Sequence, residues 1–181
     1  MKILFISDIH GITKNLDKVR RLIEKNNFDK IVNLGDMYYC GLSIRGILEV
    51  DPNTVKDFLT NYQHKLLSLQ GNCDSEVDIE KSEFPICRDL ALINVDDINI
   101  YCTHGHIYNI NKNSKFVDGG ILIYGHFHVP YIKKVDNMTY VCVGSISLPR
   151  DKYGPTYAIY ENRKITIYSL MDDSIIFESE V

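Results

Sequence analysis

The sequence predicts an α/β fold in which two β-sheets form a sandwich flanked by helices, with residues 1–181 making up a single domain. The first half of the chain alternates short apolar runs with helix-like patterns, as parallel β-α-β units do. The second half is a series of strand-like runs separated by two-residue breaks. Strand and helix patterns of this kind pack as layers around one core, and 181 residues suffice to bury it.

In the first half, residues 2–6 (KILFI) and 30–34 (KIVNL) are short apolar runs typical of buried parallel strands. The stretch between them has the apolar spacing of an amphipathic helix, with Thr13 as its candidate N-cap. Its stripe is Leu16, Val19, Leu22 and Ile23. A second helix should begin at residues 51–52, because aspartate caps helices well and proline suits the first helical position. The stripe of that helix is Val55, Phe58, Leu59 and Tyr62, and residues 66–69 form the third strand.

Three hairpins are expected in the second half of the chain. Each of three pairs of strand-like runs is separated by two residues that tolerate left-handed turn geometry. The turns are Asp96-Asp97, Asp136-Asn137 and Asn162-Arg163.

Composition and charge limit the class of protein. The net charge is −4 and no run of Lys and Arg could follow a polyanion, so extended nucleic acid is not the expected partner, whereas a small anionic substrate is compatible. Five cysteines without a CxxC pair fit reduced thiols in the cytoplasm better than a disulfide framework. No apolar run approaches the ~20 residues of a membrane span, and the N-terminal run is too short for a signal peptide, so no membrane attachment is expected.

Five apolar runs each end in Asp, Asn or His with a glycine close by. These exits are Ser7-Asp8-Ile9-His10, Gly35-Asp36, Gly71-Asn72-Cys73-Asp74, Thr103-His104-Gly105-His106 and Gly125-His126-Phe127-His128. Ligands of open α/β sheets bind at the carboxyl ends of strands, so the five exits can converge. Each exit alone could be a helix cap, a turn or a polar loop, but one shared metal site explains all five. His64 lies outside the set and is interpreted as a surface residue.

The residue types in these exits indicate which metals they suit. Asp, Asn and His offer oxygen and imidazole ligands, which suit Mn²⁺, Fe or Zn²⁺ better than a structural thiolate site does. Seven candidate ligands are too many for one catalytic ion, which must keep a coordination position open for water or substrate, so two ions are expected. Two divalent ions, two aspartates and one hydroxide sum to a charge of +1, which suits a singly charged phosphodiester attacked in line.

In this order, the motifs DIH, GD, GNxD, THGH and GHFH resemble those of the calcineurin-like metallophosphoesterase superfamily. Within it, the chain resembles the small single-domain bacterial and archaeal phosphodiesterases of the YfcE type. The resemblance covers essentially the whole chain and implies a two-metal centre, commonly with Mn²⁺, while Zn²⁺, Ni²⁺ and Fe remain alternatives. By motif position, Asp8, His10 and His128 would hold the first metal; Asn72, His104 and His126 the second; and Asp36 would bridge them. The implied reaction is attack on a small phosphodiester by a metal-bridging hydroxide, with Asn72 helping to stabilise the phosphoryl oxygens.

Cys73 departs from this pattern, because much of the superfamily has a histidine there that stabilises the transition state or protonates the leaving group. A thiol is a weak, uncharged donor, and losing a general acid typically costs ~10²–10⁴ in rate. Three interpretations of Cys73 stay open: a small residue filling the floor of the site, a weak proton donor beside Asp74, or a metal ligand or nucleophile. Asp74 could instead order a water or a loop. His106 is either a substitute proton donor or a loop-stabilising side chain.

The segment after Asp36 could form a wall of the substrate site. Tyr38 or Tyr39 could stack on a base or aryl group, or could anchor the loop, and Arg45 could meet an anion. Two other functions stay open: a phosphomonoesterase acting on nucleotides or phosphoproteins, and a non-catalytic scaffold like the retromer subunit that shares this fold. Scaffold relatives have lost metal-ligand histidines, whereas this chain keeps them all. A homo-oligomer is compatible with the sequence.

Overall fold

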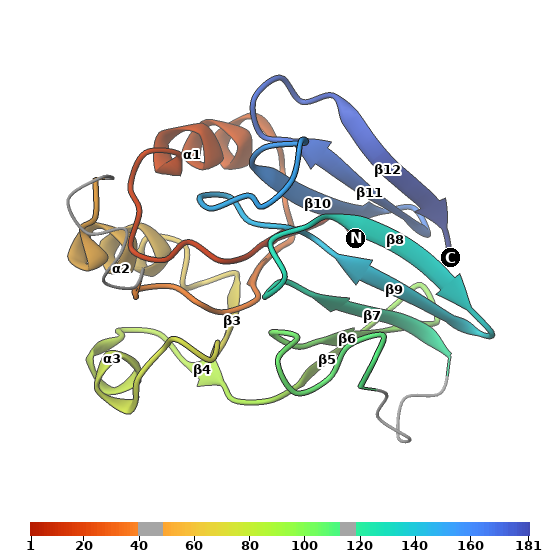
Figure 1. The fold of residues 1–181 in the computed structure, drawn as a ribbon, viewed down its shortest axis with the longest axis horizontal. Helices are drawn as coiled ribbons and strands as arrows, with labels where there is room; N and C mark the ends of the chain where they lie inside the picture. The colour runs from red at the N-terminus through yellow and green to blue at the C-terminus, as the bar shows by residue number, and fades with distance from the viewer. Residues whose placement is uncertain (40–48, 113–118) are drawn as a thin grey trace.

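The computed structural model describes residues 1–39, 49–112 and 119–181, and these residues form two mixed β-sheets with helices outside (Figure 1). In chain order the elements are β1 (Ile3–Ile6), α1 (Leu16–Lys25), β2 (Lys30–Asn33), α2 (Pro52–Thr60), β3 (Leu66–Leu69), α3 (Glu76–Lys81), β4 (Ile86–Cys87), β5 (Ala91–Val95), β6 (Ile98–Cys102), β7 (Gly120–Tyr124), β8 (Tyr131–Val135), β9 (Met138–Cys142), β10 (Thr156–Glu161), β11 (Lys164–Ser169) and β12 (Ile175–Glu180). The seven-stranded sheet has the order β12-β11-β10-β1-β2-β3-β4 and the five-stranded sheet the order β5-β6-β7-β9-β8. The predicted fold class is confirmed.

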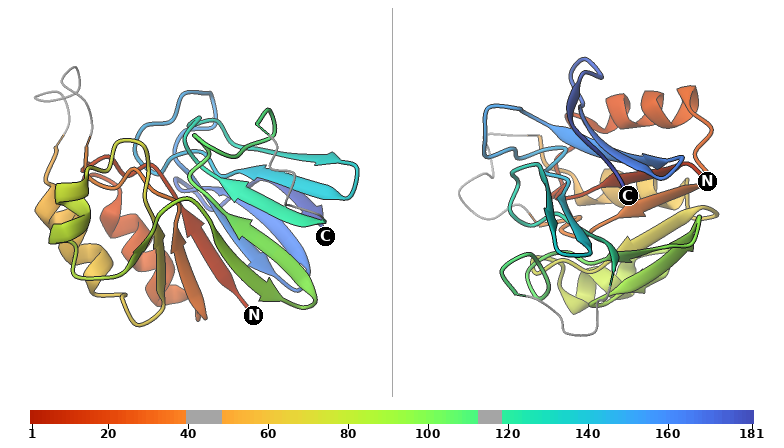
Figure 2. Two further views of the ribbon diagram at one scale, coloured as in Figure 1. Left: turned by 90° about the horizontal axis from the view of Figure 1, so that it is seen from below. Right: turned by 90° about the vertical axis from the view of Figure 1, so that its right-hand side faces the viewer.

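The parallel strands predicted from the first half lie side by side in the seven-stranded sheet. β1 pairs with β2 and β2 with β3, all parallel, and β1 is buried along its whole length. Leu4 and Ile6 pack with residues of α1 and α2, whereas Ile3 and Phe5 pack against the five-stranded sheet. Both faces of the sheet are therefore covered, as Figure 2 shows, which explains why its strands read as continuous apolar runs.

The predicted stripes of both helices are confirmed in large part, but one predicted cap is wrong. Asp51 caps α2 by accepting hydrogen bonds from the Asn53 and Thr54 amides. The N-cap of α1 is Asn15 and not Thr13. The Asn15 side chain makes no capping bond and donates instead to the Ile146 carbonyl at 2.7 Å, so this residue ties the helix to a loop of the site.

The three predicted hairpins are confirmed as antiparallel pairs: β5 with β6, β8 with β9, and β10 with β11. Five of their six turn residues adopt the left-handed conformation expected of them, for example with φ values of 52° at Asp96 and 60° at Asp97, whereas Asn137 does not. Among the described residues, no helix combines the length and apolar character needed to cross a membrane.

Candidate metal centre

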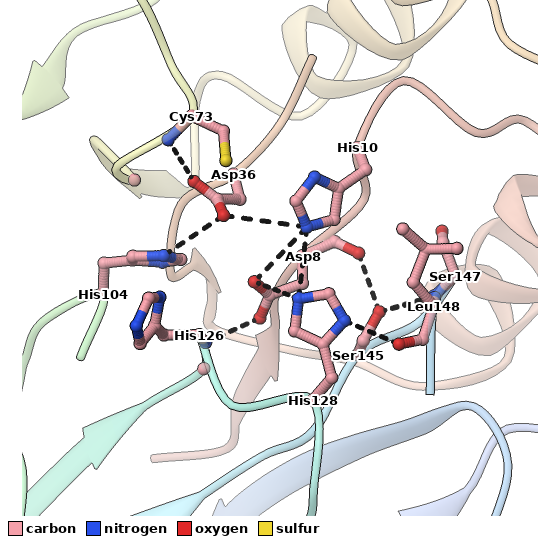
Figure 3. A network of polar contacts seen from close by, with 12 residues as sticks. Asp8, His10, Asp36, Cys73, His104, His126, His128, Ser145, Ser147 and Leu148 are labelled. Carbon is pink, nitrogen blue, oxygen red and sulfur yellow. Dashed lines mark hydrogen bonds and ion pairs between the residues drawn. The ribbon is translucent and has the colours of Figure 1, made fainter. Parts of the chain in front are cut away.

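The five strand exits converge, and Asp and His side chains from four of them form two clusters of ligand atoms (Figure 3). In the first cluster, atoms of Asp8, His10 and His128 all lie within 4.8 Å of one another. In the second, atoms of Asp36, His104 and His126 meet the same limit. Both sheets contribute ligand atoms. Asp8 and Asp36 follow β1 and β2 of the seven-stranded sheet, whereas the histidines at 104, 126 and 128 follow β6 and β7 of the five-stranded sheet.

The first cluster consists of nitrogen and oxygen atoms that face one another. His10 Nε2 lies 3.2 Å from His128 Nε2, which lies 3.2 Å from Asp8 Oδ1. The Nδ1 atoms of the two rings donate to the carbonyls of Tyr39 and Leu148. Because each Nδ1 carries its proton toward a carbonyl, each Nε2 is the nitrogen that can bind a cation.

Asp8 shows most directly that this cluster suits a cation. Its Oδ2 accepts a hydrogen bond from the His126 amide at 2.9 Å, whereas its Oδ1 is buried without a hydrogen-bond partner. A buried carboxylate oxygen is normally paired, and the nearest polar atoms here are two imidazole nitrogens. A proton or a divalent ion between these atoms would satisfy all of them, so the donor set fits a metal.

The second cluster repeats this arrangement with His104 in place of His10. His104 Nδ1 donates to the Leu34 carbonyl at 2.8 Å, and its Nε2 lies 3.3 Å from Asp36 Oδ2 and 3.0 Å from Asn72 Oδ1. Asn72 Nδ2 donates to Cys73 Sγ at 3.3 Å. This contact turns the amide oxygen of Asn72 toward His104, as a metal ligand at that position requires.

Asp36 belongs to the second cluster and also faces the first. Its Oδ1 accepts a hydrogen bond from the Cys73 amide at 2.8 Å. Its Oδ2 lies 3.6 Å from His10 Nε2 and 3.3 Å from His104 Nε2. One oxygen atom is therefore within reach of both groups of ligands.

The backbone of the centre is held in an uncommon conformation. Five of the residues predicted as ligands have positive φ: 56° at Asp8, 55° at His10, 54° at Asp36, 64° at His126 and 60° at His128. Such a conformation is uncommon for residues other than glycine, and strained backbone tends to concentrate at functional sites.

Gly71 is needed for space. A Cβ at this position would lie 2.0 Å from Asp36 Oδ1 and 2.2 Å from the Asp36 amide nitrogen. Only glycine lets the segment after β3 approach the Asp36 carboxylate this closely.

The family model of the calcineurin-like phosphoesterase superfamily domain matches residues 1–164. The chain belongs to the calcineurin-like phosphoesterase superfamily. It is 30% identical over 176 residues to phosphodiesterase YfcE of Escherichia coli strain K12. The aligned residues cover 97% of this chain and 96% of YfcE. The solved structure of YfcE covers 99% of both chains with a TM-score of 0.92. A phosphodiesterase of Methanocaldococcus jannaschii is 25% identical over 155 residues, 80% of this chain and 83% of that protein.

Other solved structures share the fold alone. Vps29 of Entamoeba histolytica in complex with Zn²⁺ is 20% identical, covers 99% of both chains and has a TM-score of 0.66. The family resemblance predicted from five motifs is confirmed, and membership makes the chain a metal-dependent phosphoesterase of a superfamily that binds divalent metals.

In this phosphoesterase site the pKa values of Asp8 and Asp36 are lowered and those of His10 and His104 are raised. Burial alone would raise the pKa of Asp8 and Asp36, but the facing histidines outweigh it and hold both pKa values low. Burial alone would lower the pKa of His104, but its contact with Asp36 raises that pKa to about 9. The pKa of His10 is raised in the same way by Asp8. In the metal-free chain these imidazoles hold protons that a metal ion must displace.

Asp74 orders a loop, which was one of its two predicted roles. It is buried, and its carboxylate accepts hydrogen bonds from the amides of Met37 at 2.7 Å, Tyr38 at 3.3 Å and Gly71 at 2.9 Å. These bonds fasten the segment after β2 to the segment after β3. Burial raises the pKa of Asp74, and the three amide donors partly oppose that rise.

Cys73 and His106 lie at the edge of the centre, and both are half-buried. Burial and the nearby Asp36 carboxylate raise the pKa of the Cys73 thiol to about 12, which disfavours a thiolate nucleophile in the metal-free chain. The His106 ring lies 5.4 Å from that of His104 and lines a hollow with Gln70, Asn72, Arg88 and Asp89 among others. Burial and the positive charge of His104 lower the pKa of His106, so its ring is neutral at pH 7.

The two tyrosines after Asp36 differ in exposure. Tyr38 is buried and its hydroxyl lies 2.8 Å from Ser82 Oγ, so it anchors the loop. Tyr39 has 41% of its surface exposed and remains a candidate to contact a substrate. Arg45 lies outside the described residues.

Ser145 supports the site and was not predicted to do so. Its hydroxyl donates to the Asp8 carbonyl at 2.8 Å and accepts hydrogen bonds from the amides of Ser147 and Leu148 (Figure 3). The loop that it holds carries the Leu148 carbonyl, which orients His128. The only sequence signal for this role is a Gly-Ser turn after a strand, which is common in proteins.

Metal binding should become more stabilising as the pH rises. A pKa raised from 6.5 to about 9 at His104 stabilises the metal-free fold below pH 6.5, and this contribution is lost as the pH rises through 9. A metal ion replaces the proton, so the increase in melting temperature caused by Mn²⁺ should grow between pH 6.5 and 9. Thermal unfolding with chelator and with Mn²⁺ across this range measures the effect, and a metal-induced increase independent of pH would contradict it.

Proposed function

We propose that the chain hydrolyses small phosphodiesters with two divalent metal ions, and that Mn²⁺ is the native metal. The observation that carries this proposal is the position of Asp36 Oδ2, 3.6 Å from His10 Nε2 and 3.3 Å from His104 Nε2. A carboxylate oxygen between two sets of ligands is suited to bridge two ions. The relatives named phosphodiesterase support a diester as the substrate.

The proposed ligand sets follow the two clusters. Asp8, His10 and His128 would hold the first ion, Asn72, His104 and His126 would hold the second, and both would share Asp36. When bound, two such ions acidify a water molecule and neutralise charge on the phosphoryl group. With two divalent ions, two aspartates and one hydroxide the centre would carry a charge of +1, which would complement a diester better than a doubly charged monoester.

The residues of the chain preorganise this site. Backbone carbonyls fix the rings of His10, His104 and His128, so little reorganisation is needed when a metal and a substrate bind. Asn72 is proposed to help hold the phosphoryl oxygens in addition to binding the metal. Carboxylate and amide oxygens among the ligands favour Mn²⁺ over softer ions. Residues 1–181 are proposed to act as one domain, because β10 to β12 extend the sheet that carries Asp8 and Asp36.

Ligand substitutions should lower the number of bound metals in a defined way. We expect His128→Ala to lose the first ion and His104→Ala the second, whereas Asp36→Asn should weaken both, by about tenfold or more each. Metal content after equilibrium dialysis against Mn²⁺ measures this. His64→Ala is the matched control, because His64 is exposed and outside the centre. Two ions retained in all three ligand variants would refute the assignment.

Substrate preference tests the function itself. The metal-stripped protein is supplied with Mn²⁺, Ni²⁺ or Zn²⁺ and assayed side by side with aryl diesters, alkyl diesters and the matching monoesters. We expect diesters to be cleaved faster than monoesters, and nitrophenyl diesters faster than alkyl diesters by about 10²-fold or more, because Cys73, a weak donor, stands where the family resemblance implies a histidine. Faster monoester cleavage would favour the phosphomonoesterase alternative. An inert protein that binds no metal would favour the scaffold role, for which the shared fold of Vps29 is the supporting observation.

His106→Ala should cost less than about tenfold in turnover, because a neutral imidazole is a poor general acid and a lost general acid costs 10²–10⁴. The measurement is kcat on an alkyl and a nitrophenyl diester with the same metal. A loss of a hundredfold confined to the alkyl diester would instead identify His106 as the proton donor.

A further inference from the structure

A third group of potential ligand atoms overlaps the two clusters and includes a sulfur. Atoms of His10, Asp36 and Cys73 lie within 4.8 Å of one another. Figure 3 shows the Cys73 thiol on the same side of Asp36 as the His10 ring, close to the carboxylate. Of the thiols described, those of Cys102 and Cys142 are buried in the sheets, and only Cys73 belongs to a group of potential metal ligands.

We propose that Cys73 is a conditional metal ligand, by which we mean a residue that coordinates some metal ions and not others. Together with His10 and Asp36 it binds thiophilic divalent ions such as Zn²⁺ and Cd²⁺, and it does not coordinate Mn²⁺. The inference rests on the proposed metal centre, because His10 and Asp36 also serve there. It adds a ligand that distinguishes one class of ion from another at the same place.

The position of Cys73 is fixed by its backbone. Its amide donates to Asp36 Oδ1 at 2.8 Å, and the neighbouring Asp74 fastens the segment to the amides of Met37 and Gly71. Moving the sulfur requires rotation of this short side chain and release of the hydrogen bond from the Asn72 amide, which is 3.3 Å long. A tetrahedral ion with bonds of about 2.1 Å to nitrogen and 2.3 Å to sulfur holds these two ligands about 3.6 Å apart, so atoms within 4.8 Å of one another must approach by at most about 1.2 Å.

The chemistry of the ligands explains the selectivity. Imidazole and carboxylate bind Mn²⁺ and Zn²⁺ alike, but a thiolate strongly favours the softer ions. When the sulfur–metal bond forms, the thiol proton passes to solvent, and the positive charge of the ion stabilises the thiolate beside Asp36. A thiolate in this position occupies coordination that water or a substrate would otherwise use, so the zinc form should be less active than the manganese form.

The test is the ultraviolet charge-transfer absorption of a cadmium–thiolate bond. Metal-stripped protein is titrated with Cd²⁺, and we expect the band to appear in the wild type and in Cys87→Ser and Cys40→Ser but to be absent in Cys73→Ser. Cys73→Ser should weaken Cd²⁺ binding by about tenfold or more and Mn²⁺ binding by less than about threefold. In thiol-counting assays, Cd²⁺ and Zn²⁺ but not Mn²⁺ should protect one thiol of the wild type.

The outcomes separate this inference from the proposed function. Absence of the band in the wild type, or its persistence in Cys73→Ser, overturns the conditional ligand. A band that disappears in Cys87→Ser or Cys40→Ser but remains in Cys73→Ser also overturns it, because a different cysteine would then bind the ion. The Mn²⁺ content, measured by magnetic resonance of the bound ion, reports on the two-metal centre independently. Two Mn²⁺ ions without a cadmium–thiolate band would leave the proposed function intact and refute the role of Cys73.

Discussion

The Asp36 carboxylate is the contact on which the rest of the site depends. One oxygen is held by the Cys73 amide, and the other faces imidazoles that come from different sheets, His10 after β1 and His104 after β6. Buried carboxylate oxygens and imidazole nitrogens that face one another raise the free energy of the folded chain unless a cation lies among them. The end of the sandwich at which the two sheets meet is therefore built around positive charge, supplied by protons in the metal-free chain and by divalent ions in the enzyme.

The surrounding chain maintains this arrangement at a local cost. Five residues predicted as ligands adopt positive φ, each worth on the order of 1–3 kcal/mol of strain. Gly71 leaves space beside Asp36 that no Cβ could share, and Asp74 fastens two loops through three amide bonds. The buried strands on either side supply the stability that allows this strain, which is why the fold and the site cannot be considered separately.

Much of this could be predicted from sequence, because the relevant signals are side chains at fixed places. The apolar runs, the Asp51 cap, the hairpin turns and the polar exits all depend on residue type and spacing. The carbonyls of Leu34, Tyr39 and Leu148, which orient the ligand histidines, could not be predicted, since every residue has a carbonyl. Thr13 failed as a cap because the helix starts later in the chain and Asn15 is engaged by a distant loop.

The segment Gly71 to Asp74 shows how the site accommodates a cysteine at position 73. Gly71 provides space, Asn72 turns its oxygen toward His104, and Asp74 fastens the loops. The structural contribution of Cys73 to Asp36 comes from its backbone amide, which any residue except proline would supply. Its side chain contributes separately, because the sulfur accepts a hydrogen bond from the Asn72 side-chain amide at 3.3 Å. Because the backbone amide holds Asp36 whatever the side chain, the residue at position 73 can vary in proton donation and in its contact with Asn72 while Asp36 stays in place.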